Sequence, residues 1–321
     1  MQNVTRLPAS AGSGQIRIVH LGLGAFHRAH QAVYLERYRQ RSGDDAWGVS
    51  SANLRTNVAL VDALREAGHR YHVAEYADSE HVTIREIGVI EETHFTGRDK
   101  STDGDGQWGR DREALLSRLA SPETCLVTLT VTEKGYFLSP ASGELLVDDP
   151  MIAADIASPE TPCTAPGLLV EALRQRRGAE LAPFTVLSCD NMPDNGKRTR
   201  DAVVQLAARR DTELAAWIER EVAFPCSMVD RIVPAMTEED FARLAELGIE
   251  DPNAVVGEAF SQWVVEDDFP LGRPAWEADG VEMVADVAPF ETMKLRMLNG
   301  SHSLLAYLGA LDGIETVAEA V

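Results

Sequence analysis

Short apolar runs alternate with longer amphipathic stretches along the chain. Runs rich in Val, Ile and Leu that end in glycine or polar turn residues predict buried strands, and apolar residues spaced three and four apart predict helices. The predicted strands are 16–21, 47–52, 82–90, 125–131 and 184–189. The predicted helices are 26–41, 58–66, 112–120, 168–177, 196–210, 213–222 and 237–246. This alternation predicts an α/β fold built on a mostly parallel sheet.

Two polar stretches and one long helix complete the pattern. Segment 97–111 is rich in glycine and aspartate, and segment 158–167 contains three prolines, so both predict loops. From Pro289 to about Leu311 the spacing predicts one long helix with proline near its first turn. The pattern is still helical at Val321, where the sequence stops. We therefore expect the sequence to stop inside a domain.

Composition narrows the class of protein. The 321 residues carry a net charge of -21, which argues against nucleic acid or an anionic membrane as a general partner. The first 15 residues lack an apolar core, and no run reaches the ~18 apolar residues of a membrane span, so we expect a cytoplasmic protein. The four cysteines form no Cys-x-x-Cys pair, which predicts free thiols. Nothing indicates an obligate protein partner.

The first candidate site is the motif Gly22-Leu-Gly24-Ala-Phe-His27, between the first predicted strand and helix. Glycines there permit a tight turn and a close backbone approach to a pyrophosphate at the helix N-terminus. Because His27 replaces the third glycine of the usual fingerprint, the motif also fits a plain strand–helix turn. The expected cofactor contacts in this motif are Gly22, Gly24, Ala25, Phe26 and His27.

The second predicted strand lacks the acidic residue that usually follows it at a dinucleotide site. The segment 52–57 offers Asn53, Asn57 and Arg55 instead. Arg55 fits stacking on an adenine, contact with a 2′-phosphate, or a solvated surface position. NAD is the cofactor we expect, and NADP stays open.

The predicted C-terminal helix carries a polar face. At about 100° per residue, with Lys294 at zero, Glu291 falls near 60°, His302 near 80° and Asn299 near 140°. The apolar Met293, Met297, Leu304 and Leu308 fall between roughly 260° and 320°, which predicts a stripe facing the core. The polar face fits either a solvated surface or alcohol–ketone chemistry. In the second case burial favours the neutral amine of a lysine, which takes a hydroxyl proton while Asn299 stabilises an oxyanion and His302 orients a hydroxyl.

Two polar segments follow buried strands. Parallel sheets bind ligands at the carboxyl ends of their strands, so Asn191 in segment 188–196 is placed to donate to an oxyanion. Thr130, Thr132 and Glu133 in segment 130–136 are expected where cofactor and substrate meet. The pair His27 and His30 lacks nearby acidic or cysteine partners, so we expect no metal site. No Tyr-x-x-x-Lys occurs, which disfavours the short-chain dehydrogenase mechanism.

Five motifs in a fixed order carry a resemblance to a known family. They are GLGAFHRAHQA (22–32), TVTEKGY (130–136), SCDNMPDNG (188–196), FPCSMVDRIVP (224–234) and KLRMLNGSHSLLAYLG (294–309). Over nearly its whole length the chain resembles the mannitol dehydrogenase family of polyol-specific long-chain dehydrogenases. FPCSMVDRIVP and MKLRMLNGSHS resemble the fructuronate reductase (D-mannonate oxidoreductase) branch most.

The resemblance implies a Rossmann-type domain over 1–285, followed by the beginning of a mainly helical domain over 286–321. It also implies metal-free catalysis between the two domains. Lys294 would be the general base, and Asn191 and Asn299 would form the oxyanion hole. His302 would position the substrate, Asp230 would line the site, and Glu291 would lie near the path by which a proton leaves.

We therefore expect NAD(H)-dependent, lysine-based interconversion of a small sugar acid, with D-fructuronate and D-mannonate as the leading pair. An uncharged polyol is the alternative, as in mannitol 2-dehydrogenase or D-arabinitol 4-dehydrogenase. Family members continue well beyond the position of Val321, so the helical domain is expected to be truncated. A truncated homologue that binds the nucleotide without turnover is the second alternative.

Overall fold

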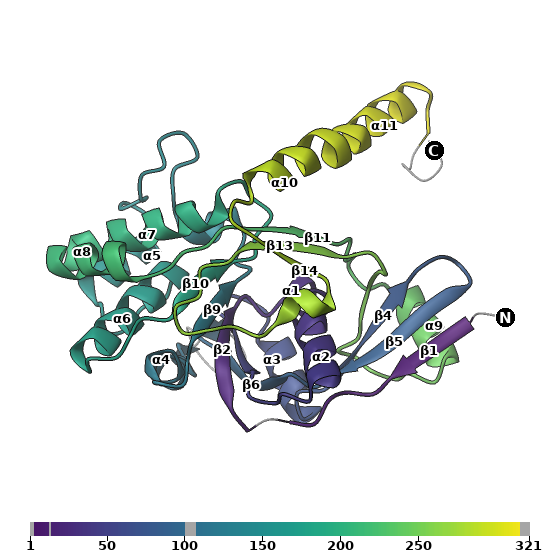
Figure 1. Ribbon diagram of the computed structural model, residues 1–321, viewed down its shortest axis with the longest axis horizontal. Helices are drawn as coiled ribbons and strands as arrows, with labels where there is room; N and C mark the ends of the chain where they lie inside the picture. The colour runs from purple at the N-terminus through teal and green to yellow at the C-terminus, as the bar shows by residue number, and fades with distance from the viewer. Residues whose placement is uncertain (1–2, 13, 100–106, 315–321) are drawn as a thin grey trace.

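The centre of the molecule is a five-stranded sheet. The computed structural model describes residues 3–12, 14–99 and 107–314 (Figure 1). The sheet has the order β10-β9-β2-β3-β6, and every neighbouring pair is parallel. Its strands are β2 (Ile16–Leu21), β3 (Gly48–Asn53), β6 (Ile90–Phe95), β9 (Leu126–Leu129) and β10 (Thr185–Ser188). Numbered along the chain and read from β6, the order is 3-2-1-4-5, which is that of a Rossmann fold. The predicted parallel α/β fold is confirmed.

Both faces of this sheet are buried, which explains the continuous apolar runs of its strands. Val19, Val127 and Val186 enter one core, which helices α4, α6, α7 and α8 close. Ile18, Leu126 and Leu187 enter a second core, together with α2 and α3. The helices of the domain are α1 (Ala25–Ala29), α2 (Gln31–Ser42), α3 (Val58–Glu66), α4 (Arg112–Ala120), α5 (Pro150–Ala157), α6 (Ala165–Gly178), α7 (Asn195–Arg210) and α8 (Thr212–Glu221).

The helix predicted over 26–41 is divided at His30. His30 leaves the helical conformation, with φ -119 and ψ -85, and separates α1 from α2. Its Nε2 lies 3.0 Å from the carbonyl oxygen of Gln262, and its ring is fully buried. A hydrogen bond to a segment 232 residues away in sequence causes this break, so local spacing could not predict it.

A second sheet lies beside the first, on the right of Figure 1. It comprises β1 (Asn3–Leu7), β5 (His81–Ile87), β4 (Tyr71–Tyr76) and β12 (Val255–Glu258), in that order, and α9 (Glu238–Glu246) packs on it. The strand predicted over 82–90 is confirmed as β5 as far as Ile87 but does not continue to Ile90, where β6 begins in the central sheet. The chain changes sheets at Gly88, whose N–H donates to the Glu36 carboxylate at 2.8 Å. Thr237 and Asp240 form a capping box at the start of α9.

A third sheet of three strands covers α1 and α2. It has the order β11 (Ser227–Asp230), β13 (Gln262–Glu266) and β14 (Val281–Val284). The loop predicted over 97–111 contains a two-residue ribbon of β7 (Arg98–Asp99) and β8 (Gln107–Trp108), and the remaining short elements are the 3-10 helices η1 (Glu133–Tyr136) and η2 (Trp276–Asp279). The loop predicted over 158–167 ends early, because α6 begins at Ala165. All four cysteines are free, as predicted.

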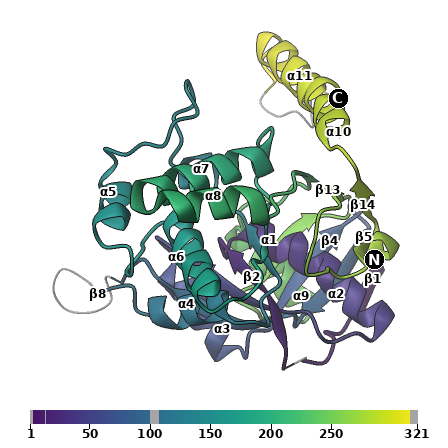
Figure 2. The same ribbon diagram turned by 60° about the vertical axis from the view of Figure 1, so that its left-hand side comes forward.

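The C-terminal helix extends away from the body of the molecule (Figures 1 and 2). It consists of α10 (Ala288–Met293), a π-helical turn (Lys294–Asn299) and α11 (Gly300–Leu311). The stripe predicted to face the core is instead exposed, from 46% at Met293 to 68% at Met297. Leu304 and Leu308 are 59% and 51% exposed. Two features explain the error: the wider π turn changes the helical phase, and the helix touches the body only near its start.

Candidate functional site

The glycine turn after β2 lies where the order of the central sheet reverses, between β2 and β9. Dinucleotides bind at this point in Rossmann folds. Gly22 has a φ of 113, and a Cβ added to it would lie 2.1 Å from the carbonyl oxygen of Thr130. Only glycine therefore permits this approach of the two loops. Gly24 is the N-cap residue of α1 and has no side chain with which to cap the first amides of that helix. Those amides are left for a ligand or solvent.

A cavity of about 180 Å³ lies beside this turn. Three of the predicted cofactor residues, Gly22, Arg55 and Thr130, line it. The sequence did not indicate a second part of the wall, which comes from the first turn of α5 and from the start of α6 with the two residues before it. The remaining lining residues are Asn53, Leu54, Thr56, Val131, Gly135, Phe137, Met151, Cys163, Thr164 and Ala165. Thr164 caps α6 and precedes a proline in its first turn, a signal that could have marked this wall.

Other predicted cofactor residues lie elsewhere. Ala25 and Phe26 begin α1, as expected. Thr132 follows the lining segment, and its N–H donates to the Asp190 carboxylate at 2.9 Å. Glu133 is exposed and forms an ion pair with Arg198 at 3.1 Å, so its side chain is not part of the cavity wall.

His27 belongs to the core beneath the turn. Its ring is 2% exposed and stacks on His20, with the ring centroids 3.4 Å apart. Burial lowers the pKa of His27 well below its usual value and that of His20 to about 3, so both rings are neutral. His20 in turn lies 2.7 Å from the hydroxyl of Thr128 and 2.9 Å from that of Thr130. The residue that replaces the third glycine thus packs under the turn, and its side chain is not part of the cavity wall.

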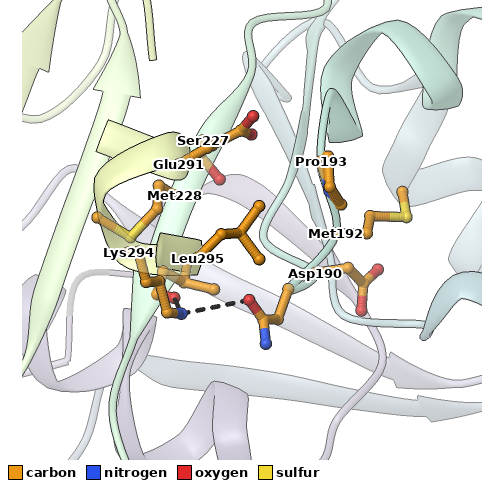
Figure 3. A pocket seen from close by; sticks show the side chains of 10 residues that line it. Asp190, Met192, Pro193, Ser227, Met228, Glu291, Lys294 and Leu295 are labelled. Carbon is orange, nitrogen blue, oxygen red and sulfur yellow. Dashed lines mark hydrogen bonds between the residues drawn. The ribbon is translucent and has the colours of Figure 1, made fainter. Parts of the chain in front are cut away.

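Lys294, the first residue of the π turn, points into the body of the molecule and is 9% exposed (Figure 3). Its Nζ donates to the carbonyl oxygen of Val229 at 2.5 Å and to Oδ1 of Asn191 at 3.2 Å. It also lies 3.4 Å from the carboxylate of Asp230. Three segments far apart in sequence therefore meet at one ammonium group: the turn after β10, the end of β11 and the C-terminal helix.

A cavity of about 110 Å³ surrounds this group. Asn191, Glu291 and Lys294 line it, as Figure 3 illustrates for the two charged residues. Burial raises the pKa of the Glu291 carboxyl, and its Oε1 has no hydrogen-bond partner among the described residues. The remaining lining residues are Asp190, Met192, Pro193, Ser227, Met228, Val229 and Leu295. The cavity therefore brings together an amide, an ammonium and a carboxyl group, of which the last two can exchange a proton.

One predicted catalytic residue, His302, is not brought together with Lys294. His302 lies on α11, is exposed and does not line the cavity. Asn299 ends the π turn, and its side chain lies outside the described part of the chain. The π turn changes the angular relation on which the predicted polar face depended.

No cluster of three or more His, Cys, Asp or Glu residues able to hold a metal ion occurs within 3–12, 14–99 and 107–314. Over the same ranges, no helix has the length and apolar character needed to cross a membrane.

Known proteins and family models resemble this chain. Residues 16–278 match the mannitol dehydrogenase Rossmann domain, and residues 286–321 match the mannitol dehydrogenase C-terminal domain. The chain belongs to the mannitol dehydrogenase family. Among its relatives, D-mannonate oxidoreductase of Escherichia coli (strain K12) is 49% identical over 308 residues, which are 95% of this chain and 61% of that protein.

Two solved structures have a fold similar to that of this chain. A mannitol 2-dehydrogenase of Pseudomonas fluorescens, in a ternary complex with NAD and D-mannitol, superposes with a TM-score of 0.87 at 38% identity, over 98% of this chain and 62% of that one. A D-sorbitol dehydrogenase in substrate-free form gives a TM-score of 0.89 at 36% identity, over 98% and 64%. The chain spans about 60% of the length of the curated relatives it matches.

Proposed function

We propose that the protein is an NAD(H)-dependent oxidoreductase in which Lys294 exchanges a proton with the oxygen of a substrate carbonyl or alcohol. The carrying observation is the position of Lys294 Nζ, 3.2 Å from Asn191 and 3.4 Å from Asp230, at the carboxyl edge of a Rossmann sheet. Parallel sheets bind cofactor and substrate at this edge. The mechanism needs no metal, because a lysine is in place to transfer the proton.

The cofactor fits the turn after β2. The close approach of Gly22 to Thr130 leaves a cradle that any Cβ would fill, and the uncapped start of α1 suits a pyrophosphate. Gly22, Gly24 and the backbone of 25–27 would hold the pyrophosphate, and Arg55, Thr130 and Thr132 would border the rest of the cofactor. The relative of known structure in complex with NAD supports NAD as that cofactor, while Arg55 is compatible with NADP. When bound, the cofactor supplies or accepts the hydride.

In the reductive direction the side chains act as follows. Lys294 donates a proton to the carbonyl oxygen as the hydride reaches the adjacent carbon, which yields a secondary alcohol and a neutral amine. The Asn191 amide accepts from Lys294 through its oxygen, so its NH₂ group is available to stabilise the oxyanion. Asp230 holds the ammonium in place. For Asn299 and His302 we propose the roles of second oxyanion donor and substrate-positioning residue, on the family resemblance.

For the substrate we propose D-fructuronate, reduced to D-mannonate. The 49% identity to a D-mannonate oxidoreductase supports this choice. One observation favours a neutral polyol instead: Lys294 is the only cation among the described residues that line the 110 Å³ cavity, and Arg296, two residues on, is exposed. A carboxylate substrate needs a cationic partner in addition to the catalytic lysine. We also propose that the division between cofactor and substrate domains falls between residues 285 and 286.

The test is NADH oxidation by the protein with D-fructuronate and D-fructose side by side. Preference for D-fructuronate would support the sugar-acid assignment, and preference for D-fructose would move the protein to the polyol branch. NADH binding without turnover of either substrate would support the nucleotide-binding, catalytically silent alternative and contradict our proposal.

Lys294→Ala tests the residue that carries the proposal. We expect turnover to fall by at least about 10²-fold, the lower range of general acid–base contributions, with NADH affinity nearly unchanged. Lys197→Ala is the matched control, because Lys197 is 72% exposed and pairs with Asp194. Near-normal turnover by Lys294→Ala would refute the proton-transfer role.

A further inference from the structure

Asp190 is a buried carboxylate between the two cavities. It is 9% exposed and follows β10 directly before Asn191. Its Oδ2 accepts from the N–H of Val131 at 3.1 Å and the hydroxyl of Tyr136 at 2.6 Å. Its Oδ1 accepts from the N–H of Thr132 at 2.9 Å. Among the described residues no cation pairs with it, so these three neutral donors alone compensate the buried charge.

The segment that Asp190 holds has an unfavourable backbone conformation. Thr132 has φ 66 and ψ 161, a region that is almost restricted to glycine. A threonine stays there only when its surroundings impose the conformation. The two backbone hydrogen bonds to Asp190 come from the amides of Val131 and of Thr132 itself. The hydroxyl of the buried Tyr136, also 2.7 Å from that of Ser188, donates to the same carboxylate.

Asp190 also connects the two halves of the site. Thr130 and Val131 line the 180 Å³ cavity at the glycine turn, while Asp190 and Asn191 line the cavity of Lys294. The carboxylate of Asp190 therefore links the segment at the nucleotide cavity to the turn after β10. In that turn the next residue, Asn191, accepts a hydrogen bond from Lys294. A shift of about 1 Å between reacting groups can reduce a rate about a hundredfold, so a rigid link here has a direct catalytic consequence.

We propose that Asp190 is a positioning residue that sets the cofactor relative to the Lys294–Asn191 pair by holding the segment Val131–Thr132 in its strained conformation. The expected effect on turnover rests on the proposed function. The restraint of the backbone at Val131 and Thr132 is independent of that function.

The test compares three variants. Asp190→Asn keeps the shape of the side chain but replaces one acceptor oxygen with a donor NH₂ group, which then opposes an N–H or O–H. Tyr136→Phe removes one of the three donors and leaves both backbone bonds. Asp251→Asn is the matched control, because Asp251 accepts from two backbone N–H groups and one side chain, at 2.8 to 2.9 Å, and lines neither cavity.

Hydrogen exchange and kinetics are measured on each variant. For Asp190→Asn we expect faster exchange of the amides of 131 and 132, weaker NADH binding and a decrease of kcat of about tenfold to a hundredfold. The primary deuterium isotope effect on kcat should rise, because a misaligned hydride transfer becomes slower than the other steps. Tyr136→Phe should change each quantity in the same direction by less. Asp251→Asn should be less stable than the wild type, but its kcat and the exchange of the amides of 131 and 132 should be those of the wild type.

Wild-type exchange at 131 and 132 in Asp190→Asn would overturn the inference, as would a stability loss with unchanged kcat and isotope effect. If Asp190→Asn does not fold, the smaller changes in Tyr136→Phe decide the question. Absence of wild-type turnover would refute the proposed function alone, and the exchange data would still test the restraint.

Discussion

Gly22→Ala is the change that tests the architecture of the cofactor turn most directly. The added Cβ would lie 2.1 Å from the carbonyl oxygen of Thr130 and 2.9 Å from its hydroxyl oxygen, and real Cβ atoms essentially never approach other atoms within 3.0 Å. The turn and the Thr130 segment must therefore separate by about 1 Å at least. The φ of 113 at Gly22 is also unfavourable for alanine.

Two effects destabilise the folded state of Gly22→Ala, and their free energies add. Forcing an extra carbon into a packed site costs about 1–3 kcal/mol, and a positive φ costs a residue with a Cβ about 1 kcal/mol or more. The free energy of unfolding should therefore fall by about 2–4 kcal/mol. Because Gly22 and Thr130 both line the cofactor cavity, their separation should also raise the Kd for NADH at least about tenfold, or about 1.4 kcal/mol.

The assay is denaturant unfolding together with NADH titration by fluorescence. Gly43→Ala isolates the backbone cost, since Gly43 has a φ of 68 at the end of α2 with nothing within 4 Å of the added Cβ. The free energy of unfolding of Gly43→Ala should be lower than that of the wild type by about 1 kcal/mol, and its Kd for NADH should be unchanged. If Gly22→Ala loses no more stability than Gly43→Ala and binds NADH equally well, the close approach of the two loops is not a functional constraint.

Two further predictions concern stability. Burial lowers the pKa of His30 to about 3 in the folded state, against 6.5 for the ordinary side chain. Below pH 6.5 His30 becomes protonated in the unfolded chain but stays neutral in the folded one. The free energy of unfolding therefore decreases as the pH is lowered from 6.5 to about 3. His30→Gln should reduce the slope of the free energy of unfolding against pH by about 1.4 kcal/mol per pH unit, measured by urea unfolding at several pH values in this range. An unchanged slope would mean that the pKa of His30 is the same in the folded and unfolded chains. Thr237→Ala removes the capping box of α9 and should cost about 1 kcal/mol in thermal unfolding, whereas wild-type stability would show that the cap contributes nothing.

Local sequence determined the central sheet and its helices. β2, β9 and β10 are continuous apolar runs because helices cover both faces of their sheet, and the alternation of strand and helix implied the parallel order. Helices α3 and α4 have the predicted bounds, since the apolar spacing that marks a helix is a property of the local sequence. The glycines at 22 and 24 and the polar ends of the strands likewise marked the edge of the sheet where both cavities lie.

Tertiary structure decided the features that depend on distant partners. The break at His30 depends on Gln262, and the second sheet pairs β4 with β12, more than 170 residues apart in sequence, so no local window contains the cause. The C-terminal helix has a regular apolar pattern, yet Lys294 is buried and the apolar stripe is exposed. A lysine enters the interior there because Asn191, Val229 and Asp230 supply acceptors for its ammonium group, and only folding brings those acceptors together.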